Sequence, residues 1–157
     1  MNFTPKFYIP GKATAKEQTE QRRSDSITKY MATQLVTFTP EQNVSEVLSS
    51  MLKHRISGAP VLDENGDIIG MISEKDCMKV VLDYAYHNQP INQAKVRDYM
   101  STEVTTVNAD ASIFEVADLF YSYNFRRFPV MDAGRLVGQI SRRDILKAAQ
   151  KLKSTTW

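Results

Sequence analysis

The stretch Gly70-Met71-Ile72-Ser73-Glu74-Lys75-Asp76 decides the fold of this chain, because it returns as Gly138-Gln139-Ile140-Ser141-Arg142-Arg143-Asp144. In both copies an apolar strand pattern runs through a glycine into Ser-x-x-Asp, and a helical pattern follows. A serine with an acidic residue three positions later predicts a capping box, which satisfies free amides at a helix start. A helix N-terminus also favours anions, so the same hydroxyl and carboxylate can hold a phosphate and a ribose diol. The capping role exists in either case, and the two interpretations are compatible.

The flanks of this motif repeat as well. Residues 36–38, 59–62 and 68–72 predict three short strands, and an Asn-Gly pair marks a turn between the last two. Asn43 and Glu46 predict a capping box that opens a helix between the first two strands. The same order returns in the second part of the chain. The sequence therefore predicts an α/β fold of the α+β type, with two β-α-β-β-α units packed through their small sheets about a pseudo-twofold axis. This packing places the two motifs in clefts between the units.

The predicted organisation has five parts. A polar N-terminal arm covers residues 1–25, repeat 1 covers 26–82, a linker covers 83–95, repeat 2 covers 96–151, and a tail covers 152–157.

Composition limits the classes of function. The 157 residues carry a formal net charge of +2, which gives no support for nucleic-acid binding. No apolar run is long enough to span a bilayer, and residues 1–12 lack the apolar core of a signal peptide. The single cysteine, Cys77, cannot form an internal disulfide, so a cytoplasmic location and inert packing are expected. His54 and His87 are isolated, and no metal site is predicted.

These motifs resemble the CBS domain family, and their duplication looks like a stand-alone tandem CBS pair, or Bateman module. The resemblance covers residues 26–151 and rests on four motifs. They are Gly70–Asp76, Gly138–Asp144, Ala59-Pro60-Val61 and Phe128-Pro129-Val130. It implies a regulatory module that binds AMP, ADP, ATP or S-adenosylmethionine between its repeats and changes the state of a dimer or of a protein partner.

The resemblance also implies roles for particular residues. By position, Asp76 and Asp144 would grip the ribose hydroxyls, and Ser73 and Ser141 would sit at the phosphate. The residue before each strand proline would flank the base, the first strand would offer backbone contacts to adenine, and basic residues before the proline would meet phosphates. The candidate binding residues are Ser141, Asp144, Arg127, Phe128, Pro129, Gly138, Thr106, Arg126, Ser73, Asp76, Ala59, Pro60 and Thr37.

The two repeats differ in charge around these positions. Arg126-Arg127 stands where repeat 1 has Ser57-Gly58, and Arg142-Arg143 stands where repeat 1 has Glu74-Lys75. Neighbouring unit charges at an intermediate dielectric interact by roughly a few kcal/mol. We therefore expect the repeat 2 side to be the better polyphosphate site. The repeat 1 side is expected to be weak, empty or suited to a ligand of lower charge.

A homodimer is expected, because the second helix of each repeat carries a broad apolar face that one pair of repeats need not cover. An interaction scaffold without a ligand, acting on an unidentified protein partner, is the alternative, and the absence of ligand-induced stabilisation would distinguish it. An enzyme is not expected, since the sequence offers no nucleophile–base pair, metal cluster or paired-carboxylate site.

Overall fold

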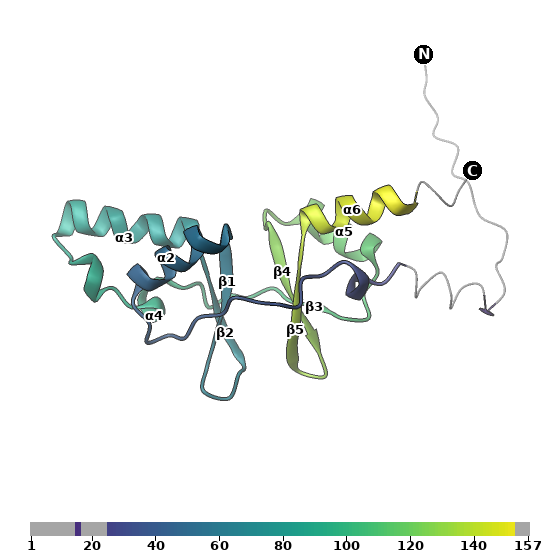
Figure 1. Ribbon diagram of the computed structural model, residues 1–157, viewed down its shortest axis with the longest axis horizontal. Helices are drawn as coiled ribbons and strands as arrows, with labels where there is room; N and C mark the ends of the chain where they lie inside the picture. The colour runs from purple at the N-terminus through teal and green to yellow at the C-terminus, as the bar shows by residue number, and fades with distance from the viewer. Residues whose placement is uncertain (1–14, 17–24, 153–157) are drawn as a thin grey trace, which may run out of the picture.

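The computed structural model describes residues 15–16 and 25–152, so the predicted arm and tail lie almost wholly outside the described residues. Two halves stand side by side, with a small sheet of each in the middle and helices on the outer faces (Figure 1). No helix among the described residues is both long and apolar enough to cross a bilayer. The arrangement is the pair of mixed helix-and-strand units, packed through their small sheets, that the duplicated pattern predicts.

The first half is built on a two-stranded antiparallel sheet of β1 (Gly58–Leu62) and β2 (Ile68–Ser73). Its helices are α2 (Val44–His54), α3 (Glu74–His87), η2 (Ile91–Gln93) and α4 (Val96–Tyr99). Apolar side chains of these elements form one core cluster, in which Val47, Val61, Ile72 and Val96 are fully buried.

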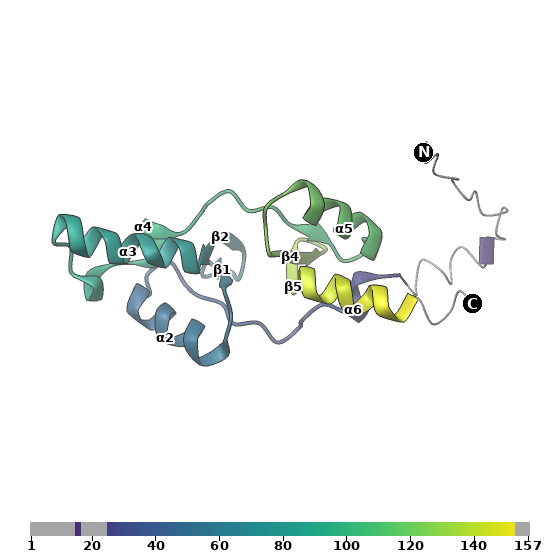
Figure 2. The ribbon, with the colours of Figure 1, turned by 90° about the horizontal axis from the view of Figure 1, so that it is seen from above.

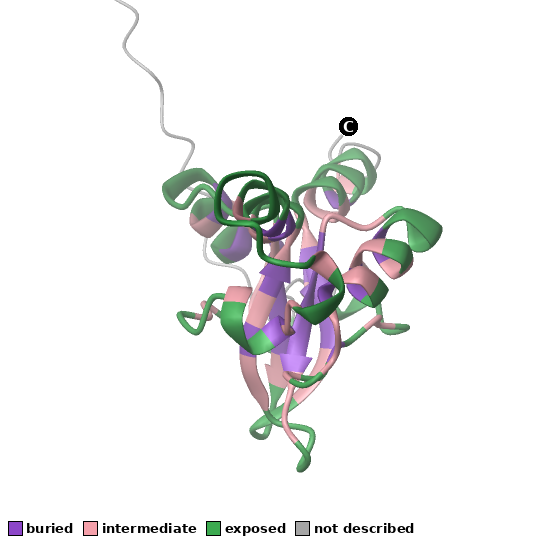
Figure 3. Ribbon diagram, turned by 90° about the vertical axis from the view of Figure 1, so that its left-hand side faces the viewer, coloured by how far each residue is buried: buried purple, intermediate pink, exposed green. Residues whose placement is uncertain are grey.

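The second half has a three-stranded sheet in the order β3 (Val107–Asn108), β4 (Arg127–Asp132) and β5 (Arg135–Ser141). Its helices are η1 (Ile27–Lys29), α5 (Ile113–Ser122) and α6 (Arg142–Leu152). These elements form a second core cluster of their own, which holds Ile27, Val116, Val130 and Ile140. Figure 3 shows the buried residues gathered along the strands and on the inward sides of the helices.

The prediction of three strands in each repeat is wrong for repeat 1. There the first strand is reduced to a single parallel bridge between Phe38 and Val61. In repeat 2 the ladder continues, because the Ala109 amide donates to the Met131 carbonyl at 2.8 Å. The counterpart of Ala109 is Pro40, which has no N–H to donate. A single proline thus accounts for the missing strand.

Each half receives a segment from the other repeat. Residues 25–32, at the start of repeat 1, dock on the second half, where the Ala32 and Gln139 backbones exchange two hydrogen bonds of 2.8 and 2.9 Å. Residues 94–101 dock on the first half, where Ser101 and Met71 exchange two equivalent bonds. We call these two stretches the crossing segments. The chain passes between the halves on opposite sides in Figure 2, so each half is completed by the other repeat.

The motif glycines allow this exchange. A Cβ built on Gly138 would lie 2.7 Å from the Ala32 carbonyl oxygen and 2.7 Å from the Met31 sulfur. A Cβ on Gly70 would lie 2.8 Å from the Met100 sulfur, in the equivalent contact. Real Cβ atoms do not approach other atoms so closely, so both positions exclude any side chain. Gly138, predicted as a binding residue, is therefore required by close packing against a crossing segment.

Two local predictions need correction. Asn43 precedes α2, but its side chain makes no capping hydrogen bond; a crossing segment supplies the partner instead, since Val44 donates to the Ala94 carbonyl. Helix α3 continues to His87 and ends at Asn88, whose φ of 52° is left-handed. The predicted linker 83–95 thus begins within a helix.

Candidate functional site

The two capping boxes form as the sequence predicts. The Asp76 Oδ2 accepts hydrogen bonds from the Ser73 amide at 2.7 Å and the Ser73 hydroxyl at 2.8 Å, and the Asp76 amide donates back to Ser73 Oγ. Ser141 and Asp144 repeat this geometry at the start of α6, with distances of 2.8 and 2.7 Å. Among the described residues, the second carboxylate oxygen of each Asp makes no hydrogen bond. Each box therefore keeps an acceptor for a further partner.

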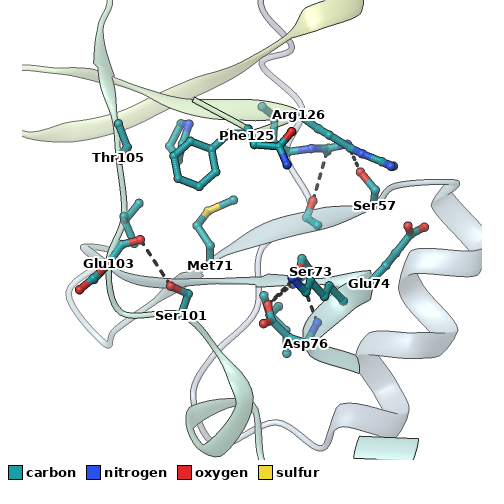
Figure 4. Close-up of a pocket in the computed structure, with 17 residues that line it drawn as sticks. Ser57, Met71, Ser73, Glu74, Asp76, Ser101, Glu103, Thr105, Phe125 and Arg126 are labelled. Carbon is teal, nitrogen blue, oxygen red and sulfur yellow. Dashed lines mark hydrogen bonds between the residues drawn. The ribbon is translucent and has the colours of Figure 1, made fainter. Parts of the chain in front are cut away.

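A cleft of about 340 Å³ lies between the halves, beside the first of these boxes (Figure 4). This volume is at the lower end of the range for small-molecule sites. Strand β2 and the start of α3 form one wall, the turn before β4 forms the facing wall, and the stretch 103–105, which precedes β3, closes one side. The lining residues are Ser57, Gly58, Met71, Ile72, Ser73, Glu74, Lys75, Asp76, Ser101, Glu103, Val104, Thr105, Asn124, Phe125, Arg126, Arg127 and Pro129.

Arg127 joins the two walls of this cleft. Its Nη2 donates to the Ser57 hydroxyl at 2.9 Å and its Nη1 donates to the Gly58 carbonyl at 3.2 Å. Burial lowers the pKa of the Arg127 guanidinium, while the charges of Asp144 and Glu74 act in the opposite direction. Within the described residues Arg127 has no carboxylate at ion-pair distance. The result is a half-buried cation, bonded only to neutral groups, at the edge of a cavity.

The structure brings only some of the predicted site residues together. Five of them line the cleft: Ser73, Asp76, Arg126, Arg127 and Pro129. Eight do not belong to its lining: Ser141, Asp144, Phe128, Gly138, Thr106, Ala59, Pro60 and Thr37. The repeat 1 box thus shares the cleft with the repeat 2 arginines, a pairing that differs from the expected one. Arg142 and Arg143 are not part of this lining, so the four arginines do not act together on it.

Phe128 and Ala59, which were predicted to flank the base, have buried side chains. Both side chains are only 1% exposed and belong to the two cores. The Phe128 ring packs against Phe120, with ring centroids 4.6 Å apart. Both residues belong to the cores on the helix side of their strands, and neither is among the lining residues of the cleft. Thr106 is also displaced, since Thr105 is the residue that lines the cleft.

Several lining residues were missed by the sequence reasoning. Phe125 is 42% exposed and presents its ring to the cleft, facing Met71 across it (Figure 4). Its ring also contacts Phe128 edge-on at 5.7 Å, so it is held by the core behind it. The sequence signal that could have identified Phe125 is an aromatic residue directly before the Arg126-Arg127 pair. No sequence motif marks Glu103. It lines the cleft because it lies where the chain passes from the first half to the second.

Cys77 follows the capping box and is buried in the first core. Burial raises the pKa of its thiol to about 11 from an ordinary 9.0, and the charges of Asp76 and Glu74 add to the shift. Between these two values the unfolded chain loses the thiol proton while the folded chain keeps it. The free energy of unfolding is therefore expected to fall as pH rises from 9.0 to about 11.

Urea unfolding at a series of pH values tests this expectation for Cys77. Since lysines and tyrosines also titrate there, the readout is the difference between the wild type and Cys77→Ala. That difference should shrink as pH rises, and parallel pH profiles for the two proteins would contradict the expected shift.

Comparison with known proteins identifies the class. Residues 27–83 and 96–151 each match the family model of the CBS domain, and together they cover most of the chain. The chain belongs to the CBS domain family, as a tandem pair.

Individual relatives agree with this assignment. The chain is 30% identical over 120 residues to the CBS domain-containing protein YhcV of Bacillus subtilis, which covers 76% of this chain and 82% of YhcV. It is 27% identical to the uncharacterized protein MJ1225 of Methanocaldococcus jannaschii, covering 79% of this chain but only 42% of that protein. The crystal structure of CBSX2 from Arabidopsis thaliana in complex with AMP matches with a TM-score of 0.71 at 26% identity, covering 82% of this chain and 98% of CBSX2.

Proposed function

We propose that this CBS pair is a non-enzymatic regulatory module that binds an adenosine-containing ligand in the cleft between its halves. The observation that carries the proposal is the half-buried Arg127 guanidinium, which faces a cavity and has no carboxylate partner among the described residues. A buried cation without a counter-charge is costly, and a phosphate is its natural partner. That the related CBSX2 binds AMP supports an adenosine ligand.

The other lining residues suit the remaining parts of such a ligand. The positive end of the α3 helix dipole favours an anion at this wall. The free oxygen of Asp76 can accept hydrogen bonds from ribose hydroxyls. The Phe125 ring and the Met71 thioether offer two apolar surfaces for a flat base.

The charge of the cleft indicates how many phosphates it accepts. Three acidic residues, Glu74, Asp76 and Glu103, line it along with three basic residues, Lys75, Arg126 and Arg127. The formal charges balance, so a second and third phosphate would meet as much repulsion as attraction. We therefore infer a preference for a monophosphate over ATP. Ligand binding across both walls would shift the population of a dimer or partner-binding state.

Thermal unfolding against AMP, ADP, ATP, NAD, S-adenosylmethionine and GTP tests the proposal. A ligand at about one hundred times its dissociation constant stabilises the folded state by about 2.7 kcal/mol. For a chain of this size that corresponds to a rise in Tm of about 5 to 10 °C. The largest rise is expected with AMP and a smaller one with ATP.

The alternative is a scaffold that acts through its surface. Apolar side chains are exposed on several helices, among them Met78 and Leu82 on α3, Leu146 on α6 and Tyr121 on α5. Such surfaces are typical of dimer or partner interfaces. A dimer mass in light scattering, together with no shift from any nucleotide at millimolar concentration, would favour the scaffold and contradict ligand binding.

A further inference from the structure

A second cavity, of about 420 Å³, adjoins the cleft and lies between the hairpin connections of the two sheets. It is lined by residues of both hairpins and of the stretch that joins the halves: Asp67, Ile68, Ile69, Thr102, Val104, Thr106, Met131 and Gly134. Of these eight residues, Val104 alone also lines the cleft. The two cavities therefore meet at residues 102–106, where the chain passes from the first half to the second.

Residues 102–106 separate the two cavities, and we call them the dividing wall. Glu103 and Thr105 line the cleft, and Figure 4 shows this stretch along one side of it. Thr102 and Thr106 line the second cavity instead. Such alternation is typical of extended backbone, whose successive side chains point to opposite faces. A single segment of chain thus forms a boundary of both cavities.

The dividing wall is held at its two ends rather than along its length. At one end Ser101 exchanges two backbone hydrogen bonds with Met71, and the other end continues into β3, which pairs with β4. Between these ends, residues 102–105 make no backbone–backbone hydrogen bond to any described residue. The Ser101 hydroxyl reaches the Glu103 carbonyl only at 3.5 Å. Segments with few backbone hydrogen bonds open at low cost in free energy.

The other walls of the cleft are fixed by regular structure. Strand β2 is paired with β1, β4 is paired on both sides, and the capping box fixes the start of α3. The turn before β4 is held by a hydrogen bond from the Arg142 amide to the Arg126 carbonyl. Since the cleft of about 340 Å³ is small for a ligand site, it gains room most easily at the dividing wall. The second cavity provides the space into which this wall can move.

We propose that the dividing wall is a movable element that transmits ligand binding from the cleft to the hairpin ends. When a ligand enters the cleft, residues 102–105 move toward the second cavity and reduce its volume. Asp67 and Met131, one on each hairpin, then change their surroundings although neither lines the cleft. The ligand favours the displaced wall because it binds that arrangement better, which is the differential affinity that a conformational change requires. This inference rests on the proposed function, and it adds the route by which an occupied cleft alters a distant surface.

Nuclear magnetic resonance of the methionine methyl groups during a titration with AMP tests the proposal. Met71 lines the cleft, Met131 lines the second cavity, and Met78 is exposed on α3 and lines neither. The signals of Met71 and Met131 should shift together and saturate at the same AMP concentration, while that of Met78 should stay in place. A shift of Met71 without a shift of Met131 would overturn the movable wall and leave the proposed function standing. If neither signal moved with AMP or with any other adenosine ligand, the proposed function would fail and this inference with it.

Thr102→Leu tests the role of the second cavity, because it adds bulk there without changing the lining of the cleft. With less room for the wall to move, the affinity for AMP in calorimetric titration should fall about 5- to 10-fold, at the lower end of the cost of overpacking. The shift of Met131 should shrink as well. Thr33→Leu is the matched control, since Thr33 is the exposed equivalent of Thr102 in repeat 1 and lines neither cavity; its affinity should be unchanged. Equal affinities of Thr102→Leu and the wild type would show that the wall does not move into the second cavity.

Discussion

Gly138→Ala is expected to lower the free energy of unfolding by about 3 kcal/mol, at the upper end of the cost of overpacking. The added Cβ would lie 2.7 Å from the backbone oxygen of Ala32, which is fixed by its bonds to Gln139 and cannot move aside. Thermal unfolding should show a fall in Tm of about 6 to 12 °C.

Gly134→Ala provides the control for Gly138→Ala. Gly134 has a φ of +76° at a hairpin turn, with no atom within 4 Å of a built Cβ. Its substitution costs only backbone strain, about 1 to 2 kcal/mol. Equal losses of Tm for the two variants would show that the contact with the crossing segment is not what makes Gly138 necessary.

Arg127→Ala is expected to reduce the affinity for AMP by about 10- to 100-fold, the cost of losing hydrogen bonds to a charged group. Arg127→Lys should give a smaller loss, because lysine keeps the charge but not the planar pair of donors. Calorimetric titration measures both. Arg135→Ala removes the same charge from an exposed strand end and should leave the affinity unchanged.

A structural effect of Arg127→Ala can be separated from its effect on binding. Arg127 also ties the second half to Ser57 and Gly58 of the first. Ser57→Ala removes one of these bonds while keeping the guanidinium in the cleft. If Ser57→Ala weakened AMP binding as much as Arg127→Ala does, the arginine would act by holding the halves together, and its role as the phosphate ligand would be wrong.

The duplicated motif was enough to predict the fold, because a capping pattern depends only on residues close in sequence and both repeats show the same order of strands and helices. Ser73 and Asp76 predict a helix start, and the identical pair in repeat 2 confirms the period. The missing strand of repeat 1 was also within reach of the sequence, since Pro40 cannot extend a ladder. However, residues 36–38, shortly before Pro40, are strong β-formers and predict a strand by themselves.

The composition of the cleft was not predictable in the same way. Resemblance placed the arginines beside Ser141 and Asp144, which are their neighbours in repeat 2. The structure keeps Arg127 paired with Ser141 in the sheet, but it also places Arg126 and Arg127 in a cleft with Ser73 and Asp76, because the packing of the halves brings the repeat 1 box against repeat 2. Phe128 illustrates the same limit, since strand alternation turns its ring into the core. The packing of the two halves decides which residues meet in the cleft. The spacing of residues within one repeat does not reveal these contacts.

The crossing segments have a consequence for the order in which the chain is made. Proteins are synthesised from the N-terminus, and early parts begin to fold before later parts exist. The first core contains Val96, so the ribosome must pass well beyond β1, β2 and α3 before that core can close. Ile27 emerges early but belongs to the second core, which also needs Ala148 of α6. Ile27 thus waits for Ala148, so the second half can close only after α6 has left the ribosome, whereas the first half can close once its crossing segment has emerged.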